Sequence, residues 1–203
     1  MGKKAVDFSD ILGQEHCKRG LEVALSGNHG VLIISPRGNA DVLKLKWAVE
    51  AVNSILPVYT AEPCVCGYFT DPKKECNCTP HGIQAHLGRI AKTAPLDRIA
   101  IHLECPRMAY PLTDKRKGEP SGEIVKRIKM VHGKEYIVPL PLDKEAGELL
   151  KLAILELGIS STAYDKICAV SGTIAIMDGK ATIEAHHISE AISYRSLDRN
   201  LWG

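Results

Sequence analysis

The sequence predicts an α/β protein in which a small parallel sheet is followed by a helical C-terminal part. Two runs, 30–35 and 99–105, are short and mainly apolar, as strands buried on both faces of a parallel sheet usually are. Residues 56–62 are a further strand candidate, and most of the chain after residue 120 has helical periodicity. We therefore expect a core of three parallel strands covered by helices.

The helices can be placed from periodicity and capping residues. An apolar face recurs over 9–27, and Gly27-Asn28 is a good end for this helix. A helix over 39–54 follows the first strand. Thr79-Pro80 begins another helix that runs to about residue 92, with a hydroxyl at the N-cap and proline at the first helical position. The helices predicted after it cover 121–131, 143–158, 161–177 and 184–196.

The helical part is expected to be a domain of its own. A boundary near 132–142 gives an α/β core, 1–132, which includes the Cys-rich loop 64–78, and a helical, lid-like domain, 143–203. A chain of 203 residues has room for one large or two small domains.

Charge and composition exclude several classes of protein. The net charge of +2 demands neither nucleic acid nor lipid nor an acidic partner. The N-terminus lacks the long apolar region of a signal peptide, and no apolar run approaches membrane-spanning length. We therefore expect a cytoplasmic protein without a membrane partner, whose seven cysteines are metal ligands and stray thiols rather than disulfides.

The stretch after the first strand has the strand–turn–helix layout of the phosphate-binding loop G-x-x-x-x-G-K-[ST]. The lysine that should reach the β- and γ-phosphates is Asp41, and the hydroxyl that should hold Mg²⁺ is Val42. A carboxylate about 4 Å from a phosphate repels it. Backbone N–H groups and Arg37 can still attract an anion, but we expect ATP and Mg²⁺ not to bind. The vestigial nucleotide-binding positions are Ser35, Pro36, Arg37, Gly38, Asn39, Ala40, Asp41 and Val42.

Four cysteines in one loop are the strongest chemical signal in the sequence. Cys64-x-Cys66 and Cys76-x-Cys78 can surround a zinc ion with four thiolates, and four protein ligands leave no open position for catalysis. We therefore expect a structural zinc. Free thiols, a disulfide pair and an iron–sulfur cluster are the alternatives. The other cysteines, Cys17, Cys105 and Cys168, are expected to be core thiols, and His186-His187 to face solvent or cap a helix.

Six stretches of the chain, in order, resemble the magnesium chelatase-like AAA+ ATPases, in particular the ComM branch associated with DNA branch migration and natural transformation. The most specific are the cysteine block and the C-terminal Tyr-Arg-Ser-Leu-Asp-Arg. The resemblance implies a P-loop NTPase-like core, in which the family's strand order is 5-1-4-3-2, and a helical lid. The matching stretches are Phe8–His16, Glu62–Pro72, Glu75–Pro80, Leu96–Ile99, Ala163–Ile167 and Tyr194–Arg199.

Compared with that family, the chain lacks the residues that would hydrolyse ATP. The long segment that carries the Walker B acids is absent, because the helix ending near Ser54 leads directly to the strand 56–62. The family's sensor asparagine is Glu62, and its lid arginine falls on Gly172. Phosphoryl transfer depends on positioning and charge neutralisation. The resemblance thus implies a truncated, catalytically inactive relative that keeps strands 1, 4 and 5 and exposes a new sheet edge.

The resemblance leaves three roles open. The chain can be a non-enzymatic partner or regulator of an intact AAA+ subunit, with Arg98 at the family's arginine-finger position or, alternatively, in an ordinary ion pair with Asp97 or Glu104. It can be a zinc-stabilised nucleic-acid-binding module that uses the basic runs 115–117 and 126–129, which are otherwise solvated faces. It can be an ATP-binding AAA+ protein linked to DNA processing. We expect the first, a binding or regulatory role, with self-association through the exposed sheet edge as a further possibility.

Overall fold

The structure confirms the predicted fold class. The computed structural model describes residues 6–93, 98–108, 117–132 and 139–198. Strands β1 (Gly30–Ile34), β2 (Val58–Ala61) and β3 (Ile99–Glu104) form a parallel sheet in the order β2-β1-β3. The first strand therefore lies in the middle. This is the order expected if strands 4, 1 and 5 of the resembling family are kept and strands 2 and 3 are missing.

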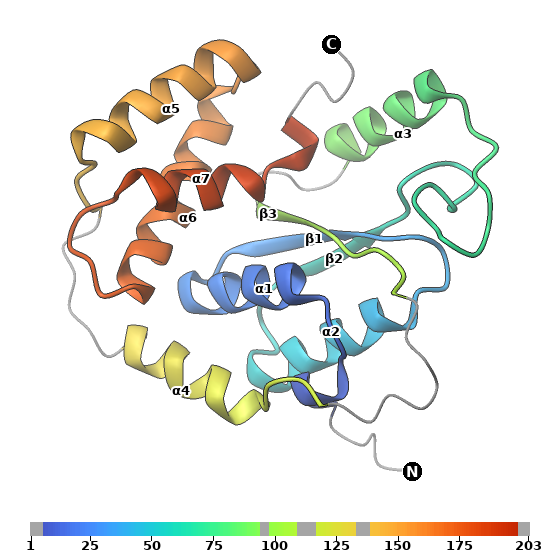
Figure 1. The fold of residues 1–203 in the computed structure, drawn as a ribbon, viewed down its shortest axis with the longest axis horizontal. Helices are drawn as coiled ribbons and strands as arrows, with labels where there is room; N and C mark the ends of the chain where they lie inside the picture. Colours follow the sequence, from blue (N-terminus) through green and yellow to red (C-terminus); the bar gives the residue numbers. More distant parts are fainter. Residues whose placement is uncertain (1–5, 94–97, 109–116, 133–138, 199–203) are drawn as a thin grey trace.

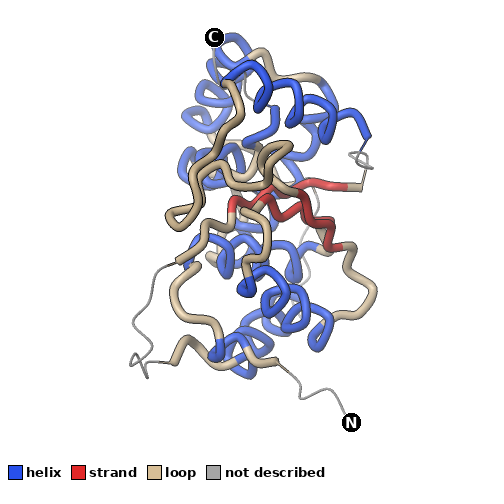
Figure 2. Tube along the Cα trace, turned by 90° about the vertical axis from the view of Figure 1, so that its right-hand side faces the viewer, coloured by secondary structure: helices blue, strands red, loops and turns tan. Residues whose placement is uncertain are grey.

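Helices lie above and below the sheet, which forms a thin central layer (Figures 1 and 2). The sheet face that contains Val31 and Ile33 packs against α1 and α2, whereas Leu32 and Ile34 pack with Ile90 on the opposite face. The helices are α1 (Glu15–Gly27), α2 (Ala40–Val52), α3 (Pro80–Thr93), α4 (Ser121–His132), α5 (Lys144–Leu157), α6 (Ser161–Met177) and α7 (Ala185–Ser193), with short 3₁₀ helices at Phe8–Asp10 and Ser196–Asp198.

The first helix begins later than the periodicity indicated. We predicted a helix over 9–27, but α1 starts at Glu15 because Gly13 and Gln14 both adopt left-handed backbone angles, with φ of 60° and 55°. Two such residues in succession cannot continue a right-handed helix. Phe8 and Ile11 are nevertheless fully buried. Their apolar side chains therefore extend the helical pattern beyond the helix itself.

The C-terminal tail covers the outer edge of β3. The predicted last helix, 184–196, ends earlier, at Ser193, and the chain then runs along the strand. The backbone N–H of His102 donates to the carbonyl of Tyr194 (2.7 Å). Burial lowers the pKa of His102 to about 3, so its neutral ring accepts a hydrogen bond from the Leu197 N–H at Nδ1 (3.3 Å). This edge of the sheet is thus already paired.

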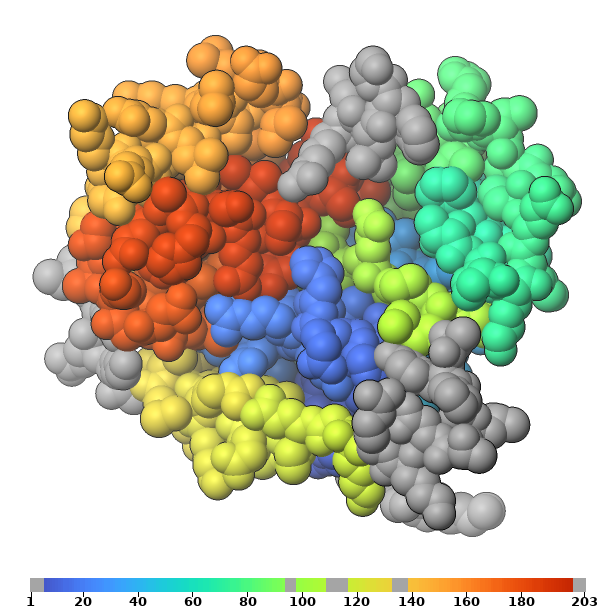
Figure 3. Space-filling view, viewed as in Figure 1, coloured from blue at the N-terminus to red at the C-terminus, as the bar shows by residue number. Residues whose placement is uncertain are grey.

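Residues from both predicted domains share one buried cluster. Leu21 of α1, Ile124 of α4 and Ile174 of α6 all belong to it, and the space-filling view shows the C-terminal helices packed closely on the N-terminal part (Figure 3). The division into 1–132 and 143–203 stays a prediction. Among the described residues, no helix is both long and apolar enough to cross a membrane.

Candidate nucleotide-binding loop and metal centre

The turn between β1 and α2 is fixed by Asn39. Its side-chain oxygen caps α2 by accepting a hydrogen bond from the Asp41 N–H (3.2 Å). Its amide nitrogen donates to Ser35 Oγ (3.0 Å) and to the carbonyls of Cys105 (3.1 Å) and Pro106 (3.3 Å). These bonds therefore hold the turn against the residues that follow the carboxyl end of β3.

Four backbone N–H groups of this turn already have protein acceptors. Ser35 N donates to the Ala61 carbonyl (3.0 Å), Arg37 N to the Gly67 carbonyl (2.8 Å) and Asn39 N to the Pro36 carbonyl (3.2 Å). Asp41 N is used by the Asn39 cap. A phosphate-binding loop works because such N–H groups point at the anion. Here a phosphate would first have to displace these bonds.

Arg37, the basic side chain of the turn, is neutralised by a carboxylate of the same chain. Arg37 forms a two-pronged ion pair with Glu62 at the end of β2, with both N–O distances 2.7 Å. The hydrogen-bonded guanidinium lowers the pKa of Glu62. A groove of about 480 Å³ lies beside this pair, lined by residues of the turn, α2 and β2. The charged residues that line the groove are Arg37 and Glu62, which are paired with each other, and Lys46 of α2.

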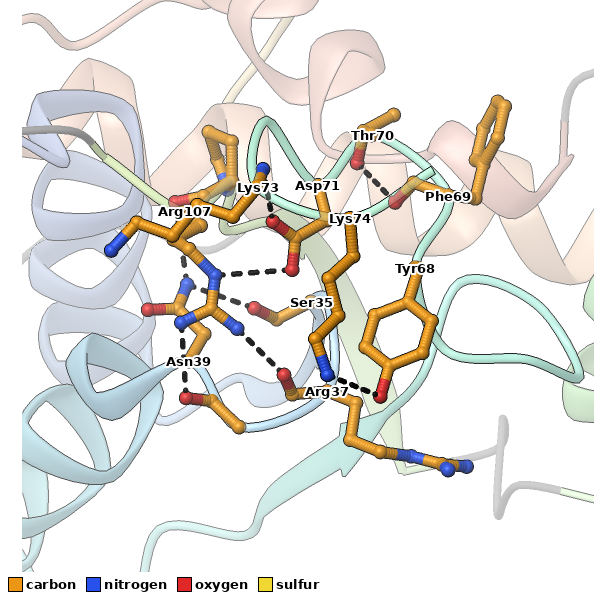
Figure 4. A network of polar contacts seen from close by, with 12 residues as sticks. Ser35, Arg37, Asn39, Tyr68, Phe69, Thr70, Asp71, Lys73, Lys74 and Arg107 are labelled. Atoms are coloured by element: carbon orange, nitrogen blue, oxygen red, sulfur yellow. Dashed lines mark hydrogen bonds and ion pairs between the residues drawn. The ribbon is translucent and has the colours of Figure 1, made fainter. Parts of the chain in front are cut away.

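A second arginine, Arg107, crosses the loop (Figure 4). Its Nη2 donates to the carbonyl of Arg37 (2.7 Å) and its Nη1 to that of Gly38 (3.3 Å). Its Nε donates to Asp71 of the Cys-rich loop (3.1 Å). Hydrogen bonds from the Lys73 N–H and then from Arg107 lower the pKa of Asp71. Arg107 therefore holds the Cys-rich loop against the degenerate phosphate loop.

The four predicted metal ligands come together. The Sγ–Sγ distances are 3.4 Å for Cys64–Cys66, 3.6 Å for Cys66–Cys76 and 3.8 Å for Cys64–Cys76. All four sulfurs, including that of Cys78, lie within 4.8 Å of one another. Four sulfurs at about 2.3 Å from a tetrahedral zinc are about 3.8 Å apart. The donor set and spacing therefore fit a zinc ion.

The loop backbone supports thiolate ligands. A hydrogen bond from the Tyr68 N–H lowers the pKa of Cys66 to about 6, and the Phe69 N–H donates to Cys64 Sγ (3.3 Å). Gly67 has a φ of 82°, and a Cβ there would lie 2.9 Å from Arg37 Cβ. A glycine is needed at this position both for the turn and for the close approach to the phosphate loop.

The other predicted sites are only partly tested. Arg98 is exposed just before β3, and its arginine-finger role stays a prediction. Its possible partner Asp97 and residues 115–116 of the first basic run lie outside the described residues. In the second run, Arg127 pairs with Glu22 and Glu119, and Lys126 with Glu123. Cys17 and Cys105 are buried as expected, and Cys168 is half-buried.

A cluster of Asp178, His186 and His187 was not predicted. Asp178 Oδ2 lies 3.7 Å and 3.4 Å from the two Nε2 atoms. However, His187 Nδ1 accepts a hydrogen bond from the Glu184 N–H (2.9 Å) and caps α7. The neutral ring then carries its proton on Nε2, which can donate toward Asp178 but cannot bind a metal. The two histidines were expected to face solvent or to cap a helix. His186 is exposed and His187 is buried, where it caps α7.

Family models match almost the whole chain. The model "Magnesium chelatase, subunit ChlI" matches residues 7–57 and 42–112, and "Magnesium chelatase, subunit ChlI C-terminal" matches residues 109–195. The chain is 30% identical to "Uncharacterized protein YifB" of Salmonella typhimurium, over 96% of this chain and 61% of that protein. It is 27% identical to "Competence protein ComM" of Haemophilus influenzae, over 98% of this chain and 62% of that protein.

The same matches show where this chain is shorter than its relatives. The alignment with the Salmonella protein has 311 positions, whereas this chain has 203 residues, so more than one hundred aligned positions are gaps in this chain. The two matches of the first model overlap at residues 42–57, in α2 and the turn after it. The missing positions therefore fall where the sequence passes directly from α2 to β2. The chain spans about three fifths of the length of these relatives.

Proposed function

Since the chain belongs to the magnesium chelatase ChlI family of AAA+-like proteins, we propose that it is a member that neither binds nor hydrolyses ATP and that acts by binding. The observation that carries this proposal is the internal bonding of the phosphate loop. Ser35, Arg37, Asn39 and Asp41 give their N–H groups to protein acceptors. The Arg37–Glu62 pair uses the charge that would otherwise attract a phosphate.

Zinc has a structural role in this proposal. Cys64, Cys66, Cys76 and Cys78 would hold the ion and close the loop that Arg107 fastens to the phosphate loop. Four thiolate ligands would leave no position for water or substrate. The metal would therefore stabilise the blocked state of the phosphate loop rather than take part in a reaction.

The partner we propose is an intact AAA+ subunit, to which this chain would present Arg98 from the start of β3. A link to DNA processing is a second candidate, favoured by the similarity to a relative named as a competence protein. Binding of nucleic acid through residues 126–129 has less support, because Lys126 and Arg127 are already paired with carboxylates.

Phosphate release from Mg·ATP by the purified protein tests the loss of hydrolysis. We expect no release above the buffer rate, with or without single-stranded DNA. The informative comparison is the variant Asp41→Lys/Val42→Thr, which restores the two side chains of the motif. It should stay inactive, because the loop N–H groups remain bonded and the segment with the Walker B acids is still missing. Turnover by the unaltered protein would contradict the proposal.

A further inference from the structure

The two outer edges of the sheet differ in their hydrogen bonding. The outer edge of β3 is paired with the C-terminal tail, as described above for His102 and Tyr194. The carbonyls of Pro57, just before β2, and of Ala61 accept from the N–H groups of Val31 and Ser35, so alternate residues of β2 face β1. The N–H and C=O groups of Val58 and Thr60 therefore point outward, and none of them has a hydrogen-bond partner among the described residues. An unpaired edge of this kind is a template for another strand.

An apolar stripe on α2 continues this edge. Leu43 is 52% exposed and Trp47 40% exposed, one turn apart on the helix, and Ile55 in the following turn is 87% exposed. Leu43 and Lys46 line the groove of about 480 Å³ together with Thr60. The start of the stripe, at Leu43, and the free strand edge therefore border the same groove. Large exposed apolar side chains gathered at an open edge mark an interaction site.

The charges on the stripe are self-complementary. Lys46 and Glu50 lie four residues apart on α2, and neither has an ion-pair partner among the described residues. When two copies of α2 run antiparallel with Trp47 near the twofold axis, Lys46 of each copy faces Glu50 of the other. A twofold interface uses the same patch on both copies, and this patch meets that requirement.

The spacing of the elements allows both contacts at once. Helix α1 contacts β1 and β3, and α2 lies beside α1 on the same side of the sheet (Figure 1). Leu43 and Lys46 of α2 line one groove with Thr60 of β2. If α2 covers β1 and β2 equally, pairing of two β2 strands places the two α2 helices about two strand spacings apart, roughly 9.6 Å. Packed helices are 8–10 Å apart. The helices can therefore touch without opening the strand pair.

We propose that two copies of this chain associate through β2 and α2, forming a continuous six-stranded sheet. The two β2 strands pair antiparallel about Tyr59, so that Val58 of each copy exchanges hydrogen bonds with Thr60 of the other. Trp47 then packs against the same residue of the other copy, and Leu43 is buried against the partner's α2. The pairing covers the edge that the shortened region between α2 and β2 leaves open, and it does not depend on whether a nucleotide binds.

Sedimentation velocity of the full chain, from about 1 to 100 µM, tests this proposal. We expect a reversible monomer–dimer equilibrium. Thr60→Pro removes an outward N–H that β1 does not use, and proline is tolerated in that orientation on an edge strand. It should weaken the dimer about tenfold or more. Circular dichroism and thermal unfolding of the monomer show whether the variant remains folded.

Charge reversal gives the more specific test. Lys46→Glu alone should weaken the dimer about tenfold, because it places like charges opposite each other. The double variant Lys46→Glu/Glu50→Lys should restore it to within about threefold. Leu152→Glu, at a residue that is 54% exposed on α5, is the control and should have no effect. A monomer at all concentrations would overturn the proposal. So would a dimer that Thr60→Pro and Lys46→Glu leave intact, or one that Leu152→Glu dissociates.

Discussion

Replacement of Cys76 by serine is expected to abolish metal binding and to lower the melting temperature by roughly 10 °C. A ligand present at about a thousand times its Kd contributes enough stability, by mass action, for a shift of this size in a chain of this length. The loss arises because Cys64, Cys66 and Cys78 alone cannot complete a tetrahedral site. The Cys-rich loop would then be held to the core chiefly by Arg107 and by the bond from Arg37 N to the Gly67 carbonyl.

Metal analysis and thermal unfolding check this expectation. The unaltered protein should contain one zinc per chain, and removal of the metal with a chelator should reproduce the Cys76→Ser melting temperature. Cys168→Ser is the matched control, since Cys168 is half-buried and lies outside the cluster. A Cys76→Ser protein that keeps one metal per chain and its full melting temperature would show that the four thiols do not form a site.

The second large effect is expected for Arg195→Ala, which should destabilise the fold by about 3–5 kcal/mol. Arg195 is 5% exposed. Its Nη1 donates to the carbonyls of Ile99 (3.2 Å) and Ala100 (3.1 Å), and its Nε donates to Asp198 (2.5 Å). Removal of the side chain leaves two carbonyls at the start of β3 without this donor and a carboxylate without its partner. The tail then loses its attachment to the sheet edge.

Chemical denaturation measures this free energy. Arg89→Ala on α3 is the control, because Arg89 is exposed and its replacement should change stability by less than about 0.5 kcal/mol. The prediction fails if both variants unfold at the same denaturant concentration. Tyr194 and Arg195, the first two residues of the motif Tyr-Arg-Ser-Leu-Asp-Arg, are the ones that contact β3.

The sequence predicted the sheet because its signals are local. Gly30–Ile34 is apolar throughout and fully buried, and strand periodicity needs no knowledge of distant residues. Helix capping is also local: the side chains of Asp143 and Ser160 cap α5 and α6. The start of α1 was missed because the buried Phe8 and Ile11 extend the apolar pattern, while the conformations of Gly13 and Gln14 leave no trace in that pattern.

The contacts that block the phosphate loop could not be predicted in the same way. The loss of the lysine and the hydroxyl is visible at Asp41 and Val42. Arg107, however, reaches Arg37 and Asp71 across long stretches of sequence, and such pairings depend on how the loops fold over the sheet. The pair of Arg37 and Glu62 could have been suspected, since Glu62 ends the strand beside β1 and faces the turn. Residues of opposite charge that directly follow two neighbouring parallel strands indicate that such an ion pair can form.

Titration of a fluorescent ATP analogue with Mg²⁺ into the zinc-loaded protein tests whether the internally bonded phosphate loop is closed to nucleotide. We expect no saturable binding up to millimolar analogue. We expect the same result for Glu62→Gln, in which Arg37 loses its ion pair but the N–H groups of Ser35, Arg37, Asn39 and Asp41 stay bonded. Saturable binding at micromolar concentration by the unaltered protein would contradict this expectation, because the loop would then give up its internal bonds to a phosphate.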